Sequence, residues 1–117
     1  MFTARILGAA ALALGLIATG PVHAQAKERV PAMRVLLEND KVRVTEMAFL
    51  PGDVSRGDRK ARTDYIVTSG NLERTSKDGK KTVYQRTAGT AHWLEADSDV
   101  VKNVGKTTFV VITVTNK

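Results

Sequence analysis

Cysteine is absent from this sequence of 117 residues, so no disulfide can stabilise the fold and no thiolate can bind a metal or act as a nucleophile. Histidine is nearly absent, with only His23 and His92. Neither a G-x-S-x-G sequence nor a glycine-rich phosphate loop leading into a helix occurs. No catalytic residue can therefore be assigned, and nucleophilic catalysis lacks support.

Aromatic side chains are also few, at 5% of the residues, and they form no stacking platform for nucleic acid. Positive charge is in excess, with 18 basic against 12 acidic residues and a net charge of +6. Acidic residues lie between the basic ones along the chain, and the densest basic cluster is Arg56, Arg59, Lys60 and Arg62. We therefore expect no nucleic-acid partner. The charge predicts either a solvated basic surface or affinity for small anions.

A long apolar run occurs at the N-terminus, from Ile6 to Thr19. About 20 apolar residues are needed to span a bilayer, so this run is short for a transmembrane helix. Arg5 precedes it, and the sequence Val22-His23-Ala24 follows it, which is the order of a cleaved secretory signal peptide. Residues 1–24 are therefore predicted to be removed. The mature protein, with no membrane span, is then expected in the periplasm or outside the cell.

Cleavage after Ala24 leaves 93 of the 117 residues, and it lowers the net charge from +6 to +5 because Arg5 is the one charged residue lost. A chain of that length makes one small domain with one core. Without disulfides, its stability must come from packing and strand pairing. A sheet continued across a homodimer would add buried area, so a homodimer is expected.

After this segment, almost every pattern indicates β-strand. Residues 25–32 are polar and are predicted to be a flexible leader. Asp78-Gly79 is a hairpin signal between two extended runs. No stretch has a sustained helical period, so residues 33–117 are predicted to form an all-β sandwich or closed barrel. The expected strands lie at 33–38, 41–50, 63–68, 71–76, 81–86, 90–94, 98–104 and 107–115.

Two of these strands have unusual patterns. Residues 41–50 alternate through Val42 and Val44 and then change phase to Met47 and Phe49, which predicts a bulge or a crossing between two layers. The last strand, 107–115, is apolar on both faces in its middle, which predicts a central strand with both faces buried.

The order of these pieces resembles that of small single-domain cupins. The resemblance is carried by Glu38 to Val44, Pro51-Gly52-Asp53, Asp64 to Val67 with Ser69-Gly70, Asp78-Gly79-Lys80, Ala88-Gly89, Trp93, and Asn103 to Thr107. It covers residues 33–117 and implies a cupin-like jelly-roll β-barrel, a fold that is often dimeric.

Cupins usually hold a divalent metal through two His and a Glu in a first motif and one His in a second. In this sequence the corresponding places fall at Asp58, Lys60, Asp64 and Asp99. One histidine, His92, and scattered carboxylates are a poor ligand set for iron, copper or nickel. The resemblance therefore implies the fold, and the residues predict neither a bound metal nor another cofactor.

Two hypotheses concern the place of the missing metal. In the first, Lys60 or a neighbouring Arg lies among carboxylates there, and the alternative is that Asp58 and Lys60 are solvated loop residues. In the second, the basic cluster recruits a small anion at the barrel mouth, with aromatic residues lining the pocket. The predicted ligand-binding residues are Arg56, Arg59, Lys60, Arg62, Tyr65 and Trp93. Strand alternation puts Trp93 and His92 on opposite faces.

Three functions remain open from the sequence. The first, and the preferred one, is an exported barrel that binds a small molecule without a metal, with no specific activity assigned and enzyme activity left open. The second is a degenerate cupin enzyme that uses Asp64, Asp99 and His92 in acid–base steps, or a weakly held metal. The third is a structural barrel without a ligand, whose interior is filled by Val67, Tyr65, Trp93 and Val111.

Overall fold

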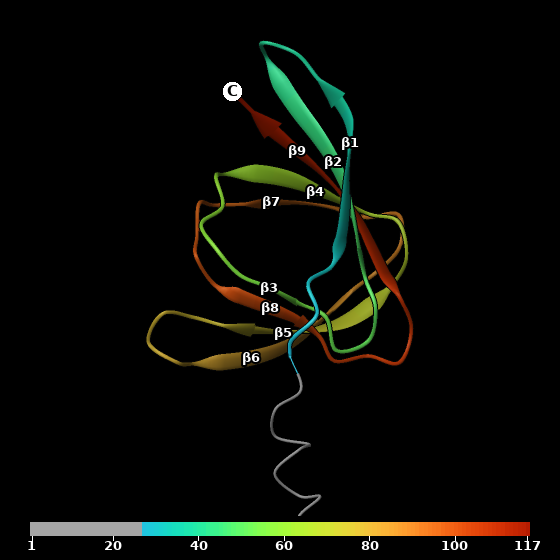
Figure 1. Ribbon diagram of the computed structural model, residues 1–117, viewed down its shortest axis with the longest axis vertical. Helices are drawn as coiled ribbons and strands as arrows, with labels where there is room; N and C mark the ends of the chain where they lie inside the picture. Colours follow the sequence, from blue (N-terminus) through green and yellow to red (C-terminus); the bar gives the residue numbers. More distant parts are fainter. Residues whose placement is uncertain (1–26) are drawn as a thin grey trace, which may run out of the picture.

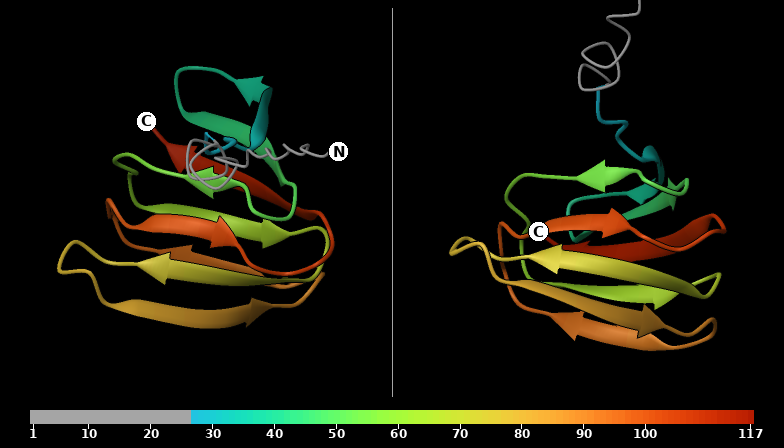
Figure 2. Two further views of the ribbon diagram at one scale, coloured as in Figure 1. Left: turned by 60° about the horizontal axis from the view of Figure 1, so that its bottom comes forward. Right: turned by 90° about the horizontal axis from the view of Figure 1, so that it is seen from below.

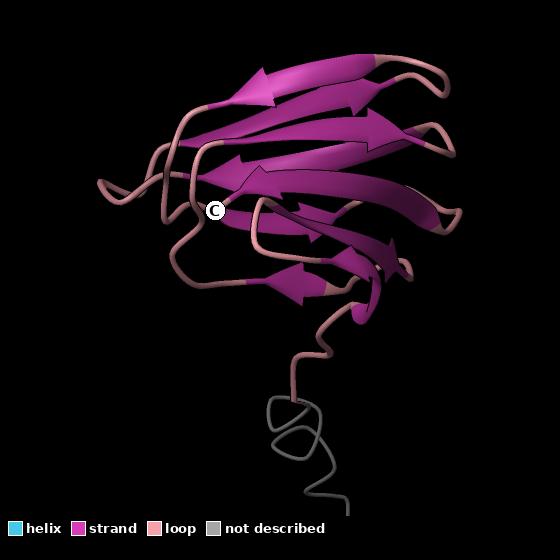
Figure 3. Ribbon diagram, turned by 90° about the horizontal axis from the view of Figure 1, so that it is seen from above, coloured by secondary structure: helices cyan, strands magenta, loops and turns pink. Residues whose placement is uncertain are grey.

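The computed structural model describes residues 27–117 of the chain, and the predicted signal peptide at 1–24 lies outside the described residues. All the regular structure in the described part is β-strand, as Figure 3 shows, and none of it is a helix that could cross a membrane. The strands are β1 (Ala32–Glu38), β2 (Val42–Phe49), β3 (Val54–Ser55), β4 (Arg62–Ile66), β5 (Gly70–Thr75), β6 (Lys81–Arg86), β7 (Ala91–Leu94), β8 (Val100–Asn103) and β9 (Phe109–Asn116).

The strands form two antiparallel sheets that face each other (Figures 1 and 2). One sheet has the order β1-β2-β9-β4-β7 and the other has the order β3-β8-β5-β6. Strands far apart in sequence are neighbours: β2 pairs with β9, and β5 pairs with β8. This arrangement is a jelly roll, and it confirms the all-β prediction from the sequence.

The core lies at the end of the barrel where β2 finishes and β9 begins. The rings of Phe49 and Phe109 meet there edge to face with 5.9 Å between their centroids. Gly70 lies against this pair, and a Cβ atom at Gly70 would be only 2.6 Å from Cδ1 of Phe109. The buried apolar cluster is made of Phe49, Ile66, Leu72, Val101, Phe109 and Val111.

Asn103 fastens this end of the barrel, and its side chain is almost fully buried. Its Nδ2 donates to the carbonyl oxygens of Phe49 and Thr107, both at 2.9 Å, and its Oδ1 accepts from the Gly105 N–H at 2.9 Å. One amide thereby joins β2, the end of β8 and the turn before β9.

The N-terminal segment of the described chain is held against the barrel. Nε of Arg29 donates to the buried carboxylate of Asp53 at 3.0 Å, and the Val54 N–H donates to the Arg29 carbonyl at 2.9 Å. Pro31 is buried. The folded part therefore begins before Met33, within the stretch 25–32 for which the sequence pattern predicts a flexible leader.

The change of phase in the apolar pattern of residues 41–50 does not come from a bulge in β2. β2 pairs with β9 from Val42 to Phe49 without any shift of register. The extra residue lies in β1, where Leu36 has no partner opposite Val44 and Thr45. The phase changes because β2 carries apolar residues on both faces, Val44 on one and Met47 on the other.

Candidate functional site

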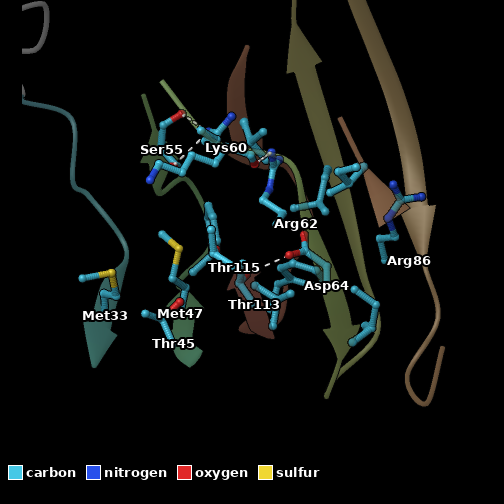
Figure 4. Close-up of a pocket in the computed structure, with 18 of the residues that line it drawn as sticks. Met33, Thr45, Met47, Ser55, Lys60, Arg62, Asp64, Arg86, Thr113 and Thr115 are labelled. Carbon is cyan, nitrogen blue, oxygen red and sulfur yellow. Dashed lines mark hydrogen bonds between the residues drawn. The ribbon is translucent and has the colours of Figure 1, made fainter. Parts of the chain in front are cut away.

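A cavity of about 430 Å³ lies between the two sheets, with the apolar core as its floor. Successive inward side chains on each strand become more polar with distance from that floor. Along β9 the inward series is Phe109, Val111, Thr113 and Thr115. On β4, Ile66 gives way to Asp64 and Arg62. Figure 4 shows the polar members of these series, Thr113, Thr115, Asp64 and Arg62, around the cavity.

Three arginines near the mouth meet at one carboxylate, Asp97. Nη1 of Arg59 lies 2.8 Å from Oδ1 of Asp97, and Nη2 of Arg62 lies 3.1 Å from Oδ2. Nη1 of Arg74 lies 3.6 Å from the same Oδ2 and 3.2 Å from Oδ2 of Asp99. We call Arg59, Arg62, Arg74, Asp97 and Asp99 the arginine cluster. It fixes the loop after β7 to β4 and β5.

Electrostatics in the cluster favour the charged carboxylate. Burial alone would raise the pKa of Asp97, but the amide N–H of Asp99 and the guanidinium groups of Arg62 and Arg59 outweigh burial and hold that pKa below its ordinary value of 3.8. The side chain of Arg62 is only 7% exposed, so its charge needs the partner that Asp97 supplies.

The cavity wall as a whole is strongly basic. Eight basic residues line it, against only Asp58 and Asp64. Four further carboxylates, which do not line the cavity, form ion pairs with some of the eight: Glu28, Glu38, Asp97 and Asp99. Two positive charges therefore remain in excess. The basic lining residues are Arg43, Arg56, Arg59, Lys60, Arg62, Arg74, Arg86 and Lys117.

Lys60 and Arg86 are the two cavity-lining cations without an ion-pair partner among residues 27–117. Neither has a carboxylate within salt-bridge distance in the part of the chain that the structure describes. The Arg86 guanidinium lies over the Tyr84 ring, 4.7 Å from its centroid, which holds the charge in place without neutralising it. Nε of Arg43 is buried and has no hydrogen-bond partner among the described residues.

The structure brings four of the predicted ligand-binding residues together. Arg56, Arg59, Lys60 and Arg62 all line the cavity, and Arg56 forms a paired contact with Glu28 at 2.6 and 2.9 Å. Tyr65 and Trp93, which the sequence pattern assigns to the same pocket, lie elsewhere. They are 47% and 58% exposed and do not line the cavity.

Four lining cations, Arg43, Arg74, Arg86 and Lys117, are not among the residues that the sequence singles out. The alternation of side chains along β5 and β6 could have identified Arg74 and Arg86. Leu72 and Arg74 face inward on β5, and Tyr84 and Arg86 face inward on β6. Among these four residues, only Leu72 is a buried apolar side chain that marks the inward face.

The places that correspond to cupin metal ligands do not form a metal site. Asp58, Lys60 and Asp64 line the cavity, but Asp99 is bound to Arg74 and Lys60 is a cation. Residues 27–117 contain no group of three His, Asp or Glu side chains placed to share an ion. The donor set therefore does not fit the metal that this fold usually holds.

The hypothesis of a basic side chain among carboxylates fits Arg62 and not Lys60. Arg62 is buried with Asp97 as its partner, whereas Lys60 is exposed. Asp58, the other residue of that proposed group, makes no hydrogen bond or ion pair within the described residues. The alternative of solvated loop residues therefore describes these two better.

The other open functions find little support in the geometry. The barrel is not filled as the structural alternative requires, because Val67, Tyr65 and Trp93 are exposed and only Val111 is inside. Within residues 27–117, the three residues considered for acid–base steps each form a hydrogen bond with a different partner and not with one another. Thr113 donates to Asp64 at 2.8 Å, Arg74 donates to Asp99, and the His92 ring lies 3.0 Å from the Thr90 hydroxyl.

Comparison with known proteins identifies relatives by structure. No protein-family model and no curated protein matches the chain. A cupin domain from Bordetella pertussis Tohama I superposes with a TM-score of 0.69 at 25% identity, over 79% of this chain and 98% of that one. A double-stranded β-helix protein from Klebsiella pneumoniae gives a TM-score of 0.60 at 19% identity, over 77% and 79% of the two chains. A cupin superfamily protein from Desulfitobacterium hafniense gives 0.55 at 17%, over 79% and 82%.

Proposed function

Because this chain has a cupin fold, we propose that it is an exported binding domain that takes a small organic anion into the barrel without using a metal. The observation that carries the proposal is the basic cavity wall, with eight cationic side chains and two positive charges in excess. Guanidinium and ammonium groups bind carboxylates and phosphates through charge-assisted hydrogen bonds. The apolar floor of the cavity lowers the local dielectric constant and strengthens such contacts.

The shape and polarity of the cavity narrow the class of ligand. One water molecule occupies about 30 Å³, so about 430 Å³ holds a ligand of roughly ten to fifteen non-hydrogen atoms. The floor is apolar, and Met33 and Met47 line one side, whereas Lys60 and Arg86 lie on other sides (Figure 4). These features fit a carboxylate with a charge of −1 or −2 and an apolar body that lies against the floor.

Isothermal titration calorimetry with matched pairs of ligands tests this class. Aromatic and medium-chain carboxylates are compared with their uncharged amides, which have nearly the same shape. We expect the acids to bind in a 1:1 ratio and the amides to bind at least about tenfold more weakly, which corresponds to about 1.4 kcal/mol. Equal affinity for acid and amide would contradict the proposal.

Two substitutions assign the binding to this cavity. Lys60→Met and Arg86→Met each remove an unpaired positive charge, and each is expected to weaken carboxylate binding about tenfold. Lys77→Met is the control, because it removes one positive charge from an exposed position in the β5–β6 turn. If Lys77→Met weakened binding as much as the other two, the net charge of the protein and not this cavity would be responsible.

Export is tested on the N-terminus of the protein. Expressed from Met1 in a bacterium with a periplasm, the chain is expected in the periplasmic fraction with Gln25 as its first residue, by intact-mass measurement. A cytoplasmic protein that keeps residues 1–24 would contradict this part of the proposal.

A further inference from the structure

Asp64 is a half-buried carboxylate in an otherwise basic part of the cavity wall. It lies on β4 between Ile66 at the floor and Arg62 in the arginine cluster, and all three side chains line the cavity. The Thr113 hydroxyl on β9 donates to its Oδ1 at 2.8 Å (Figure 4), and this is the one hydrogen bond to the carboxylate within the described residues. Oδ2 of Asp64 is therefore available to a molecule in the cavity.

None of the eight lining cations forms an ion pair with Asp64 in the part of the chain that the structure describes. Arg62 is only two residues away on the same strand, but its guanidinium contacts Asp97 instead. A carboxylate that served only to balance the wall would be expected to pair with one of these cations, because a partly buried charge gains most from an opposite charge. Thr113 thus fixes the Asp64 carboxylate without neutralising it.

A carboxylate in this place accepts hydrogen bonds and repels anions. An ionised carboxylate has about four lone-pair sites and no donor, so the hydrogen bond from Thr113 leaves most of its capacity unused. The carboxylate of a ligand is repelled by Asp64 and must lie nearer to cations such as Lys60. The part of the ligand that faces Asp64 must then carry an O–H or N–H donor.

The charge balance of the wall favours a hydroxyl over an ammonium group as this donor. Two positive charges remain in excess even when Asp64 is counted, and they repel an ammonium group but not a neutral hydroxyl. A hydroxyl also accepts hydrogen bonds while it donates one. Thr115, the next inward side chain of β9 after Thr113, can supply the donor for it.

We infer that the ligand is a hydroxy acid and that Asp64 selects it by accepting a hydrogen bond from its hydroxyl group, an inference that rests on the proposed binding of an organic anion. The layers of the cavity set the arrangement. The apolar body lies on the floor made by Phe49 and Phe109, the hydroxyl lies at Asp64, and the carboxylate lies farther out at Lys60. Successive inward side chains on a strand are only about 6.6 Å apart, so the hydroxyl belongs on one of the two carbons nearest to the carboxylate.

Asp58, the other carboxylate that lines the cavity, is poorly placed for this role. It is exposed in the loop between β3 and β4, and no hydrogen bond within the described residues fixes its orientation. A carboxylate in contact with water discriminates weakly, because water replaces a missing ligand hydroxyl at little cost. Asp58 carries the same charge in the same cavity and is therefore the matched control for Asp64.

Calorimetric titration with three acids of one shape tests the inference. 3-Phenylpropanoate is the parent acid, 3-phenyllactate adds a hydroxyl beside the carboxylate, and phenylalanine has an ammonium group at the same carbon. All three fall within the size range that the cavity sets. Each enantiomer is titrated separately. The better enantiomer of phenyllactate is expected to bind at least about tenfold more tightly than the parent acid, and also more tightly than phenylalanine.

Two variants assign the preference to Asp64. Asp64→Asn keeps an oxygen for the Thr113 hydroxyl but removes the charge, and it is expected to reduce the advantage of phenyllactate to about threefold or less. The parent acid should bind this variant as tightly as the wild type or more tightly, because a repulsive charge is gone. A merely structural role of Asp64 would weaken both acids together. Asp58→Asn is expected to leave the ratio of the two affinities unchanged, and circular dichroism checks that both variants fold.

Equal binding of phenyllactate and the parent acid to the wild type would overturn this inference and leave the proposed anion site standing. An advantage of phenyllactate that survives in Asp64→Asn, or is lost equally in Asp58→Asn, would overturn it as well. Tightest binding of phenylalanine would make the donor an ammonium group and rule out the hydroxy acid. Failure of all three acids to bind the wild type would overturn the proposed function together with this inference.

Discussion

At the scale of single residues, buried polar side chains determine the shape of this barrel as much as its apolar core does. Asn103 closes one end with three hydrogen bonds, and Asp97 gathers arginines at the other. Buried polar groups of this kind are costly when a partner is removed, because the remaining groups cannot recover water. They can therefore be tested one at a time.

Asn103→Ala is expected to destabilise the protein by about 3 kcal/mol, because it leaves two carbonyl oxygens and one N–H without partners. Chemical denaturation measures the loss. Asn71→Ala serves as the control, since Asn71 is exposed and changes at such sites stay within about 0.5 kcal/mol. Equal effects in the two variants would show that Asn103 does not fasten the barrel end.

Asp97→Asn is expected to cost about 2–3 kcal/mol at neutral pH, because Arg62 loses a buried charged partner. The folded-state pKa of Asp97 is lowered, so its contribution to stability is complete above 3.8 and disappears as pH falls through the lowered value. The difference between wild type and variant should therefore shrink below about pH 4. Asp40→Asn is the control for the loss of a carboxylate at an exposed site, and it is expected to change stability by less than about 0.5 kcal/mol at neutral pH. A difference that stays constant down to acid unfolding would contradict the role of Asp97.

At the scale of elements, the positions of all strands but the two-residue β3 follow from the sequence. The face of each strand that points inward does not. The predicted runs 71–76 and 81–86 match β5 and β6 closely, because Asp78-Gly79 marks the turn and Gly79 has a φ of +88° there. Which side of a strand faces inward depends on strands far away in the chain. β4 shows this, because its inward Arg62 and Asp64 pair across the sheet with β7 and β9.

Gly70→Ala tests how closely β5 approaches the core. The new Cβ would lie 2.6 Å from Cδ1 of Phe109, so we expect a loss of about 1–3 kcal/mol from overpacking. Phe109→Leu removes ring atoms from that place and should be less harmful in the Gly70→Ala background than in the wild type. Thermal unfolding of the four proteins gives the coupling energy. Additive effects would mean that the two positions do not contact each other.

At the scale of the whole molecule, the cavity-lining charges of the five-stranded sheet lie on its inner side, whereas Tyr65 and Trp93 lie on its outer side. The basic cluster of the loop 53–62 was a correct guide to the cavity, because Arg56, Arg59, Lys60 and Arg62 all line it. The aromatic residues were a poor guide, because Tyr65 and Trp93 are outward on strands whose inward residues are polar. No local pattern distinguishes a pocket wall from an outer face when both are partly apolar.

The central claim is that the barrel interior binds an organic carboxylate without a metal. The most direct test is calorimetric titration of a protein that has been freed of metal on a chelating resin, with an aromatic carboxylate as ligand and with zinc or manganese added to a second sample. The account predicts 1:1 binding of equal affinity in both samples, weakened by salt because the contacts are ionic. Binding that requires the added ion, or no binding of any carboxylate, would contradict it.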